Sequence, residues 1–207
     1  MQFSVYLFDF DGTLVDSRES LLPVFQAGYA VVGRTVTAEE ASRWMHVSLP
    51  ESFADSGVPQ EHYEKVAQAI IDALDLPESL AMIKAYEDTI PVLTRLVKEG
   101  KRVGIVSNNA STHIRLVLER LGVDVPLDCV VGSDMFSNGK PSPEPIDTAL
   151  NILGETDRSR VVYVGDSLQD PLCGHNAGIG GILVDRENVH PEYQGTRISN
   201  LTELFDL

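Results

Sequence analysis

Cysteine and long apolar runs are both scarce in this sequence. Its 207 residues include two cysteines, Cys129 and Cys173, which lie far apart and outside any CxxC spacing. Neither a disulfide framework nor a zinc site is therefore expected. No apolar run is long enough to cross a bilayer, and the opening residues MQFSVYLF lack the basic segment and cleavage site of a signal peptide. We expect a cytoplasmic protein without a membrane span.

Basic residues are scarce as well. There are 16 lysines and arginines against 31 aspartates and glutamates, which gives a formal net charge of −15 at pH 7. Because no dense run of Lys and Arg offsets this charge, repulsion argues against binding to nucleic acid or to an anionic membrane. Small ligands with bound cations remain compatible with it. For the oligomeric state we expect a monomer or a weak homodimer.

Short apolar runs do alternate with helical patterns along the chain. With 43% hydrophobic residues the composition is that of an ordinary globular protein. This alternation predicts an α/β fold with a parallel sheet. The expected strands are 3–8, 103–106, 129–131, 161–164 and 182–184. The expected helices 89–99, 111–121 and 144–153 are each closed by a glycine, which suits the position after a helix.

A long interval separates the first two expected strands. Most of it has the pattern of amphipathic helix, for example over 62–74. Long stretches without secondary structure are uncommon inside compact domains, so an inserted all-helical domain is the economical explanation. We place this insertion at 17–85, which leaves 1–16 and 86–207 to form the core domain.

Two acids stand one residue apart in YLFDFDGTLVDS, directly after the first apolar run. Residues two apart on an extended chain point to the same side, so Asp9 and Asp11 would project together and repel each other. One interpretation is a strand that ends in a polar turn, with Gly12 supplying unusual backbone angles and Asp16 capping the next helix. The other is a shared Mg²⁺, which carboxylate oxygens favour and which reverses the repulsion.

Three of the expected strands end in polar residues that suit a binding site. Asp9 and Asp11 follow the first strand, Ser107 follows the second, and Asp166 follows the fourth. Ligands of open parallel sheets bind at the carboxyl ends of strands, so this convergence favours a functional site. Asp166 could join the first two acids around Mg²⁺, with Asp170 one helical turn later on the same face. Helix capping is the alternative for Asp166.

The middle of the chain supplies candidates for phosphate binding. Ser107 and Asn108 lie between a strand and a helix, where a hydroxyl, an amide and free backbone N–H groups can hold a phosphate, although turn residues at such places are common. Lys140 lies in the proline-stiffened segment GKPSP. A lone loop lysine is usually solvated. Three carboxylates and a phosphate, however, need more positive charge than one Mg²⁺ provides.

These four segments resemble the motifs of the haloacid dehalogenase superfamily, in its phosphatase-like branch with a helical cap. They occur in order as DFDGTLV from Asp9, VSN ending at Asn108, Lys140 with its proline, and GDSLQD ending at Asp170. The resemblance covers nearly the whole chain, and the first and fourth motifs are the specific ones. It implies a Rossmann-like, three-layer core in which a parallel sheet lies between helices, with an inserted all-helical cap.

The resemblance also implies a division of labour. Asp9 would be the nucleophile and Asp11 the general acid and base of a phosphohydrolase that acts through an aspartyl phosphate. A carboxylate attacks phosphorus only when repulsion from the phosphate oxygens is reduced. Asp11 would protonate the leaving group and later activate water. The expected substrate is a small phosphorylated metabolite.

The ligand sites follow from the same resemblance. Mg²⁺ would be held by Asp9, by Asp166 and by the backbone carbonyl of Asp11, with Asp170 in support of that metal site. The phosphate-binding residues would be Gly12, Ser107, Asn108 and Lys140.

Position 11 narrows the branch of the superfamily. Its dehalogenase and phosphonate-cleaving branches lack an acid corresponding to Asp11, so phosphate-ester or phosphoanhydride chemistry is favoured. A sugar-phosphate mutase is the enzymatic alternative, although such mutases typically carry a histidine shortly after the first motif and this chain has none there. Phosphoglycolate phosphatases commonly have a lysine where this chain has Asn109.

The segment RWMHVSLP, 43–50, is the candidate for substrate selection by the cap. Arg43, His46 and Ser48 could contact a polar leaving group. The favoured interpretation is that the apolar residues of this segment pack the helical domain and that Arg43 is solvated. A protein that binds phosphorylated ligands without turnover is the non-enzymatic alternative, and the presence of every catalytic residue type argues against it.

Overall fold

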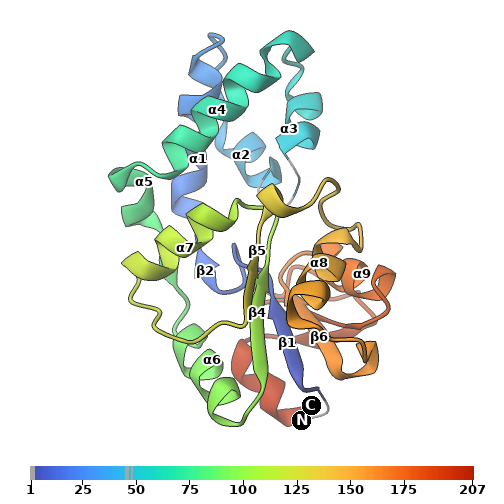
Figure 1. Cartoon of the computed structure of the whole chain (residues 1–207). Helices are drawn as coiled ribbons and strands as arrows, with labels where there is room; N and C mark the ends of the chain where they lie inside the picture. The colour runs from blue at the N-terminus through green and yellow to red at the C-terminus, as the bar shows by residue number, and fades with distance from the viewer. Residues whose placement is uncertain (1–2, 45–46, 48) are drawn as a thin grey trace. The chain divides into compact units, whose positions relative to one another are not determined.

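The computed structural model describes residues 3–44, 47 and 49–207 (Figure 1). The chain forms two compact units, Met1–Val15 with Ala85–Leu207 and, between them in sequence, Asp16–Lys84. The first is called the core unit below and the second the helical unit. Among the described residues, no helix is both long and apolar enough to cross a membrane.

A six-stranded sheet with parallel pairing throughout forms the centre of the core unit, in the order β5-β4-β1-β6-β7-β8. The strands are β1 (Val5–Phe8), β4 (Arg102–Val106), β5 (Cys129–Val131), β6 (Val161–Gly165), β7 (Gly180–Val184) and β8 (Thr196–Ile198). The chain moves from β1 outward to β5 and then returns to the other side of β1 at β6. The expected α/β fold with a parallel, Rossmann-like sheet is confirmed.

Helices cover both faces of this sheet (Figure 1). Helices α6 (Thr89–Lys98) and α7 (Ser111–Arg120) pack on one face, and α8 (Glu144–Leu153) and α9 (Gln169–Asn176) on the other. Strands buried on both faces are apolar at every position, as β1 shows: its four residues are fully or almost fully buried. Gly100, Gly122 and Gly154 follow their helices with positive φ, which confirms the three expected glycine stops.

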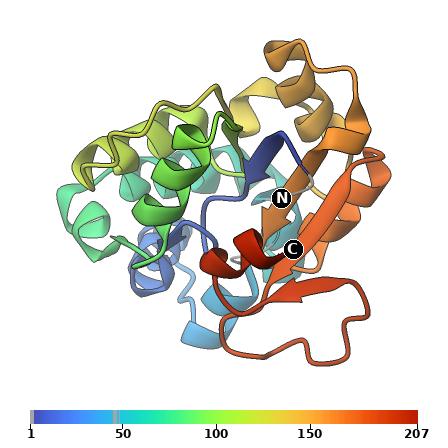
Figure 2. The ribbon, with the colours of Figure 1, turned by 90° about the horizontal axis from the view of Figure 1, so that it is seen from below.

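The C-terminal part of the core unit adds a long connection and a short helix (Figure 2). The chain leaves β7, runs through an extended loop and returns as β8, after which Leu201–Asp206 form a 3-10 helix that packs against α6 and β8. Shorter 3-10 turns occur at Ser133–Met135 and Arg158–Arg160.

The helical unit contains α1 (Arg18–Ala30), α2 (Ala38–Trp44), α3 (Leu49–Ser56), a 3-10 turn (Gln60–His62), α4 (Tyr63–Leu74) and α5 (Pro77–Met82). Its core is an aromatic cluster in which the Trp44 ring lies 5.1 Å from Tyr29 and 5.3 Å from Phe25. Helices α1 and α4 approach closely where Gly28 faces Ile70, because a Cβ at Gly28 would lie 2.2 Å from that side chain. Two short strands that pair, β2 (Val15–Asp16) and β3 (Lys84–Ala85), carry the chain into and out of this unit. Its role as a cap stays a prediction.

Candidate active site

The carboxyl ends of three neighbouring strands bring the expected site residues together. Strand β1 lies between β4 and β6, and Phe8 is level with Ile105 on one side and Val164 on the other. The residues that follow these strands therefore meet at the point where the order of the sheet reverses, which is where open α/β sheets bind ligands.

Lys140 lies between two of the expected acids. Its Nζ is 2.8 Å from Asp9 Oδ2 and 2.7 Å from Asp170 Oδ1. All three side chains are buried, with Lys140 only 7% exposed. The interpretation of Lys140 as a solvated loop lysine is therefore wrong, because the loop turns its ammonium group into the sheet edge.

The segment around Lys140 is held by contacts with Asn108 and Tyr163. The Lys140 backbone N–H donates to Asn108 Oδ1 at 3.1 Å, and the Lys140 ammonium lies 5.8 Å from the centre of the Tyr163 ring. Gly139 packs so closely on Asn108 that a Cβ there would lie 2.7 Å from Asn108 Oδ1. Asn108 therefore uses its amide oxygen to position the lysine loop.

The two acids after β6 are held differently. Asp166 lies before helix α9, which begins at Gln169. The expectation that Asp166 and Asp170 share one face of a helix is therefore wrong. Asp166 Oδ1 accepts from Thr13 Oγ at 3.1 Å. Asp170 accepts from the Ser167 N–H through Oδ2 and from Lys140 through Oδ1, so both of its oxygens are engaged.

Burial and like charge shift the pKa values in this cluster. Burial raises the pKa of Asp9 well above its usual range, and Lys140 opposes the shift. Burial, with the nearby charge of Asp170, raises the pKa of Asp166 to about 7. Burial would lower the pKa of Lys140, but Asp170 and Asp9 outweigh it and the pKa is raised. The carboxylates thus face more negative charge than one ammonium offsets.

The cluster fits a hard divalent cation. Asp9, Asp166 and Asp170 can each offer an oxygen, and these atoms all lie within 4.8 Å of one another. Asp9 Oδ1 is buried and has no hydrogen-bond partner among the described residues. A buried carboxylate oxygen without a partner is costly, and a Mg²⁺ ion would satisfy it. Because both Asp170 oxygens already accept hydrogen bonds, Asp9 and Asp166 are the better ligands.

Position 12 has room only for a glycine. Its φ is +78°, and a Cβ at this position would lie 2.1 Å from Asp166 Oδ2. Its N–H donates to the Val15 carbonyl at 2.8 Å. A role of Gly12 in phosphate binding stays a prediction. Because it has no side chain, Gly12 lets the turn after β1 approach Asp166. Gly165 does the same for Asp170, because a Cβ at Gly165 would lie 2.2 Å from Asp170 Cγ.

Asp11 stands apart from the three converging carboxylates. Its Oδ2 accepts a hydrogen bond of 3.2 Å from Asn109 Nδ2. Ser107 is buried, and its Oγ accepts from the Asn109 N–H at 3.2 Å. The Ser107 hydroxyl keeps its own hydrogen to donate. The site therefore offers a buried carboxylate beside a lysine, a second separate carboxylate and a hydroxyl donor.

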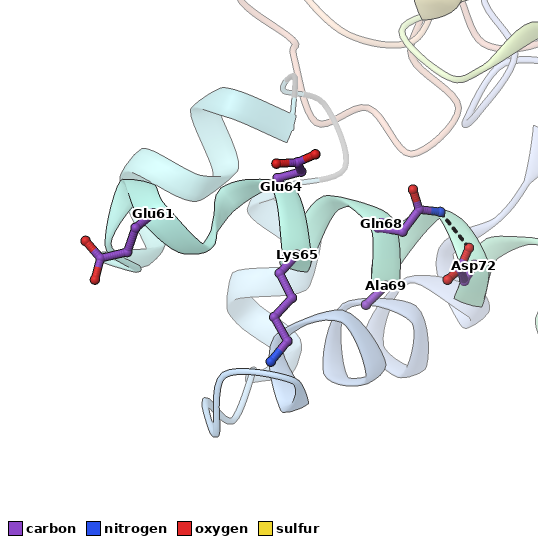
Figure 3. A pocket seen from close by; sticks show the side chains of 6 residues that line it. All are labelled: Glu61, Glu64, Lys65, Gln68, Ala69 and Asp72. Atoms are coloured by element: carbon purple, nitrogen blue, oxygen red, sulfur yellow. Dashed lines mark hydrogen bonds between the residues drawn. The ribbon is translucent and has the colours of Figure 1, made fainter.

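A hollow of about 470 Å³ lies elsewhere, on the surface of α4 (Figure 3). It is lined by Glu61, Glu64, Lys65, Gln68, Ala69 and Asp72. Gln68 donates to Asp72 one helical turn later, and the Lys65 ammonium donates to the Val31 carbonyl. These contacts are typical of a solvated helix face.

The family model described as haloacid dehalogenase-like hydrolase matches residues 6–184, which includes all four motifs. The chain belongs to this hydrolase family. The expected family and enzyme class are therefore confirmed.

Several relatives of this haloacid dehalogenase-like hydrolase carry phosphatase names. It is 30% identical over 178 residues to the pyrophosphatase PpaX of Listeria welshimeri, a match that covers 85% of this chain and 80% of the relative. It is also 30% identical to the N-acetylmuramic acid 6-phosphate phosphatase of Pseudomonas aeruginosa, over 93% of this chain and 86% of the relative. A structure from Bacteroides fragilis, described as a haloacid dehalogenase-like hydrolase, superposes with a TM-score of 0.88 at 30% identity and covers 98% of this chain and 99% of its own.

Three residues of the hydrolase site were not identified from the sequence. Thr13 bonds Asp166, Asn109 bonds Asp11, and Tyr163 lies beside Lys140 while its hydroxyl donates to the Val106 carbonyl. Thr13 lies inside the first motif and Asn109 directly follows the second, so their position in the sequence was a usable signal. Tyr163 gave none, because it lies inside an apolar strand.

The expected substrate-selecting segment is described in part. His46, Ser48 and Met45 lie outside the described residues. Trp44 is buried in the core of the helical unit and Leu49 packs against that core, as the favoured interpretation held. Arg43 bonds Asp55 at 3.1 Å and lies 3.5 Å from Glu39. It is paired with its own unit's acids.

Proposed function

We propose that the protein is a Mg²⁺-dependent phosphatase that cleaves a small phosphorylated metabolite through an aspartyl phosphate on Asp9. The observation that carries the proposal is the placement of Asp9. One of its oxygens is held by the Lys140 ammonium and the other is buried without a partner, at the carboxyl edge of the sheet. Lys140 thus fixes the orientation of the Asp9 carboxylate, while Oδ1 is free of any hydrogen-bond donor among the described residues.

In the first step Asp9 attacks the phosphorus atom and the bond to the leaving oxygen breaks. Lys140 and the Ser107 hydroxyl bind phosphoryl oxygens and reduce their repulsion from Asp9. Asp11 gives its proton to the leaving oxygen, so that a neutral alcohol departs. Asn108 contributes by holding the Lys140 loop.

In the second step Asp11 accepts a proton from a water molecule. The resulting hydroxide attacks the phosphorus of the aspartyl phosphate, and the Asp9 carboxylate leaves. Inorganic phosphate is released and both acids return to their starting forms. Asp9, Asp166 and the backbone carbonyl of Asp11 would hold Mg²⁺, which when bound offsets the negative charge of the phosphoryl group.

The relatives suggest which substrates to test first. Their names include a pyrophosphatase and a sugar-acid 6-phosphate phosphatase, so pyrophosphate and N-acetylmuramic acid 6-phosphate head the panel. Phosphoglycolate and hexose phosphates complete it. We further propose a cytoplasmic enzyme that is a monomer or a weak homodimer, which sedimentation of the purified chain would measure. Both described cysteines are free and buried, as a reducing compartment allows.

The proposal is tested with 4-nitrophenyl phosphate. We expect phosphate release with Mg²⁺, none with EDTA, and recovery when Mg²⁺ is restored. After rapid acid quenching, mass mapping should place a phosphoryl group on Asp9. The Asp9→Asn variant should form no adduct and lose activity, because an amide cannot replace the nucleophile. An adduct on another residue would overturn the mechanism, and binding of the panel without turnover would favour the non-catalytic alternative.

A further inference from the structure

Asn109 connects the general acid and base candidate to the start of helix α7. Its Nδ2 donates to Asp11 Oδ2 at 3.2 Å, and its Oδ1 accepts from the Ala110 N–H at 2.9 Å. One side chain therefore spans from the turn after β1 to the turn after β4. Nothing in the four motifs assigns it a role.

The orientation of this amide is fixed by chemistry. An amide oxygen only accepts and an amide nitrogen only donates. If the amide were flipped, its oxygen would face the Asp11 carboxylate and its nitrogen would face the Ala110 N–H. Both contacts would be repulsive, so the observed orientation is the only one that satisfies both neighbours.

The backbone of Asn109 is fixed as well. Its N–H donates to Ser107 Oγ at 3.2 Å, and its carbonyl accepts from the Ser133 N–H at 2.9 Å. Gly132 packs against it, because a Cβ there would lie 2.6 Å from the Asn109 carbonyl oxygen. The donor aimed at Asp11 is therefore preorganised on both its backbone and its side chain.

We propose that Asn109 is a positioning residue that holds the Asp11 carboxyl group in the orientation needed for proton transfer. The inference rests on the proposed function, in which Asp11 protonates the leaving oxygen. Asp11 stands apart from the carboxylate cluster, and a carboxyl group on a short side chain can rotate. One fixed donor on Oδ2 limits this rotation and leaves the other oxygen to exchange protons with the reacting groups.

A helix cap is the competing explanation, and the structure provides a control for it. Asp134 also caps α7, since its carboxylate accepts from the Ser111 N–H at 2.6 Å and from Ser111 Oγ at 2.7 Å. No contact joins Asp134 to Asp11 among the interactions of the described chain. Asp134→Ala therefore weakens the same helix start without changing the support of Asp11.

The test compares two aryl phosphates that differ in their need for a proton. Phenyl phosphate releases a weakly acidic phenol, whereas 4-nitrophenyl phosphate releases a good leaving group. Asn109→Asp keeps an oxygen toward Ala110 and replaces the donor to Asp11 by an acceptor. Asn109→Ser keeps a short acceptor and cannot reach Asp11, which provides a second variant if the first folds poorly.

We expect both Asn109 variants to lose about 10- to 100-fold in kcat/KM with phenyl phosphate and less than about threefold with 4-nitrophenyl phosphate, because full general acid catalysis contributes 10² to 10⁴. With 4-nitrophenyl phosphate the adduct on Asp9 should accumulate, since its hydrolysis still needs Asp11. Asp134→Ala should change kcat/KM by the same factor with both substrates. Equal losses with both substrates in the Asn109 variants, no loss, or the same discrimination in Asp134→Ala would overturn the inference. A wild-type protein without an Asp9 adduct would instead overturn the proposed function and this inference with it.

Discussion

Lys140 brings a positive charge into the buried acidic cluster. Its ammonium group bonds Asp9 and Asp170 at 2.8 and 2.7 Å and is almost fully buried. At a buried site water screens charges only weakly, so the repulsion among the acids is strong and each charged group is stabilised mainly by its oppositely charged partner. Removal of the lysine should therefore affect catalysis more than its single charge suggests.

Lys140→Met keeps the length of the side chain and removes the charge. We expect kcat/KM for 4-nitrophenyl phosphate to fall by about 10² to 10³, the range for a lost electrostatic contact in an active site. Lys98→Met is the control, since Lys98 lies exposed at the end of α6. Activity within about threefold of wild type in Lys140→Met would show that Lys140 does not support phosphoryl transfer.

The site residues differ in how far the sequence could predict them. Asp9 and Asp166 follow apolar strands, and strand ends of a parallel sheet meet at one edge, so their proximity was predictable. The separation of Asp11 from them was not, because residues two apart on a strand were expected to project together. The burial of Lys140 and the bond from Asn109 to Asp11 were not predictable either. Both depend on the exact path of loops between distant parts of the chain, which no local pattern encodes.

Among the elements, the central strands were the easiest to predict. The strand 129–131 and the helix 144–153 have the expected bounds. Strand β8 was missed, because its residues Thr196 and Arg197 are exposed and it lies at the edge of the sheet, where an apolar run is not needed. The 3-10 helix after it was missed for its shortness.

The connection between β7 and β8 is organised by one buried carboxylate. Asp185 accepts from the N–H groups of Val189 and His190 and from Arg197, with donor distances of 2.7 to 2.9 Å. Burial would raise the pKa of Asp185, but these donors outweigh it and the pKa is lowered. The ionised form therefore stabilises this loop.

This arrangement predicts a pH-dependent stability. A carboxyl group whose pKa is lowered on folding stabilises the protein above its unfolded value of about 4, and this stability is lost as the pH falls through the folded pKa. Asp185→Asn should lower the free energy of unfolding by about 1 to 3 kcal/mol at pH 7, which is the penalty for leaving buried donors unsatisfied. Urea unfolding of the wild type and of Asp185→Asn from pH 7 to pH 3 should show that the difference between their free energies of unfolding shrinks below about pH 4. A difference that stayed constant would mean that the charge of Asp185 is not what stabilises the loop.

For the molecule as a whole, we expect a bound cation to reduce the repulsion within the acidic site and so to favour folding. Three carboxylates converge within 4.8 Å around one buried lysine, in a chain with a net charge of −15. A ligand that binds only the folded state raises stability by mass action. Mg²⁺ should thus be both a cofactor and a stabiliser, and these two effects can be measured separately.

Saturating Mg²⁺ should raise the Tm of the wild-type protein by several degrees over the protein in EDTA, since a ligand at 100 times its Kd adds about 2.7 kcal/mol. Asp166→Asn removes one converging carboxylate, so its Tm in EDTA should be no lower than that of wild type, while the increase with Mg²⁺ should be mostly lost. Asp124→Asn removes an exposed carboxylate and should keep the full increase. Differential scanning calorimetry with NaCl at matched ionic strength separates specific binding from screening of the net charge. If NaCl reproduced the increase, or if Asp166→Asn retained it, Asp9 and Asp166 would not hold the metal, and the unpartnered oxygen of Asp9 would need another explanation.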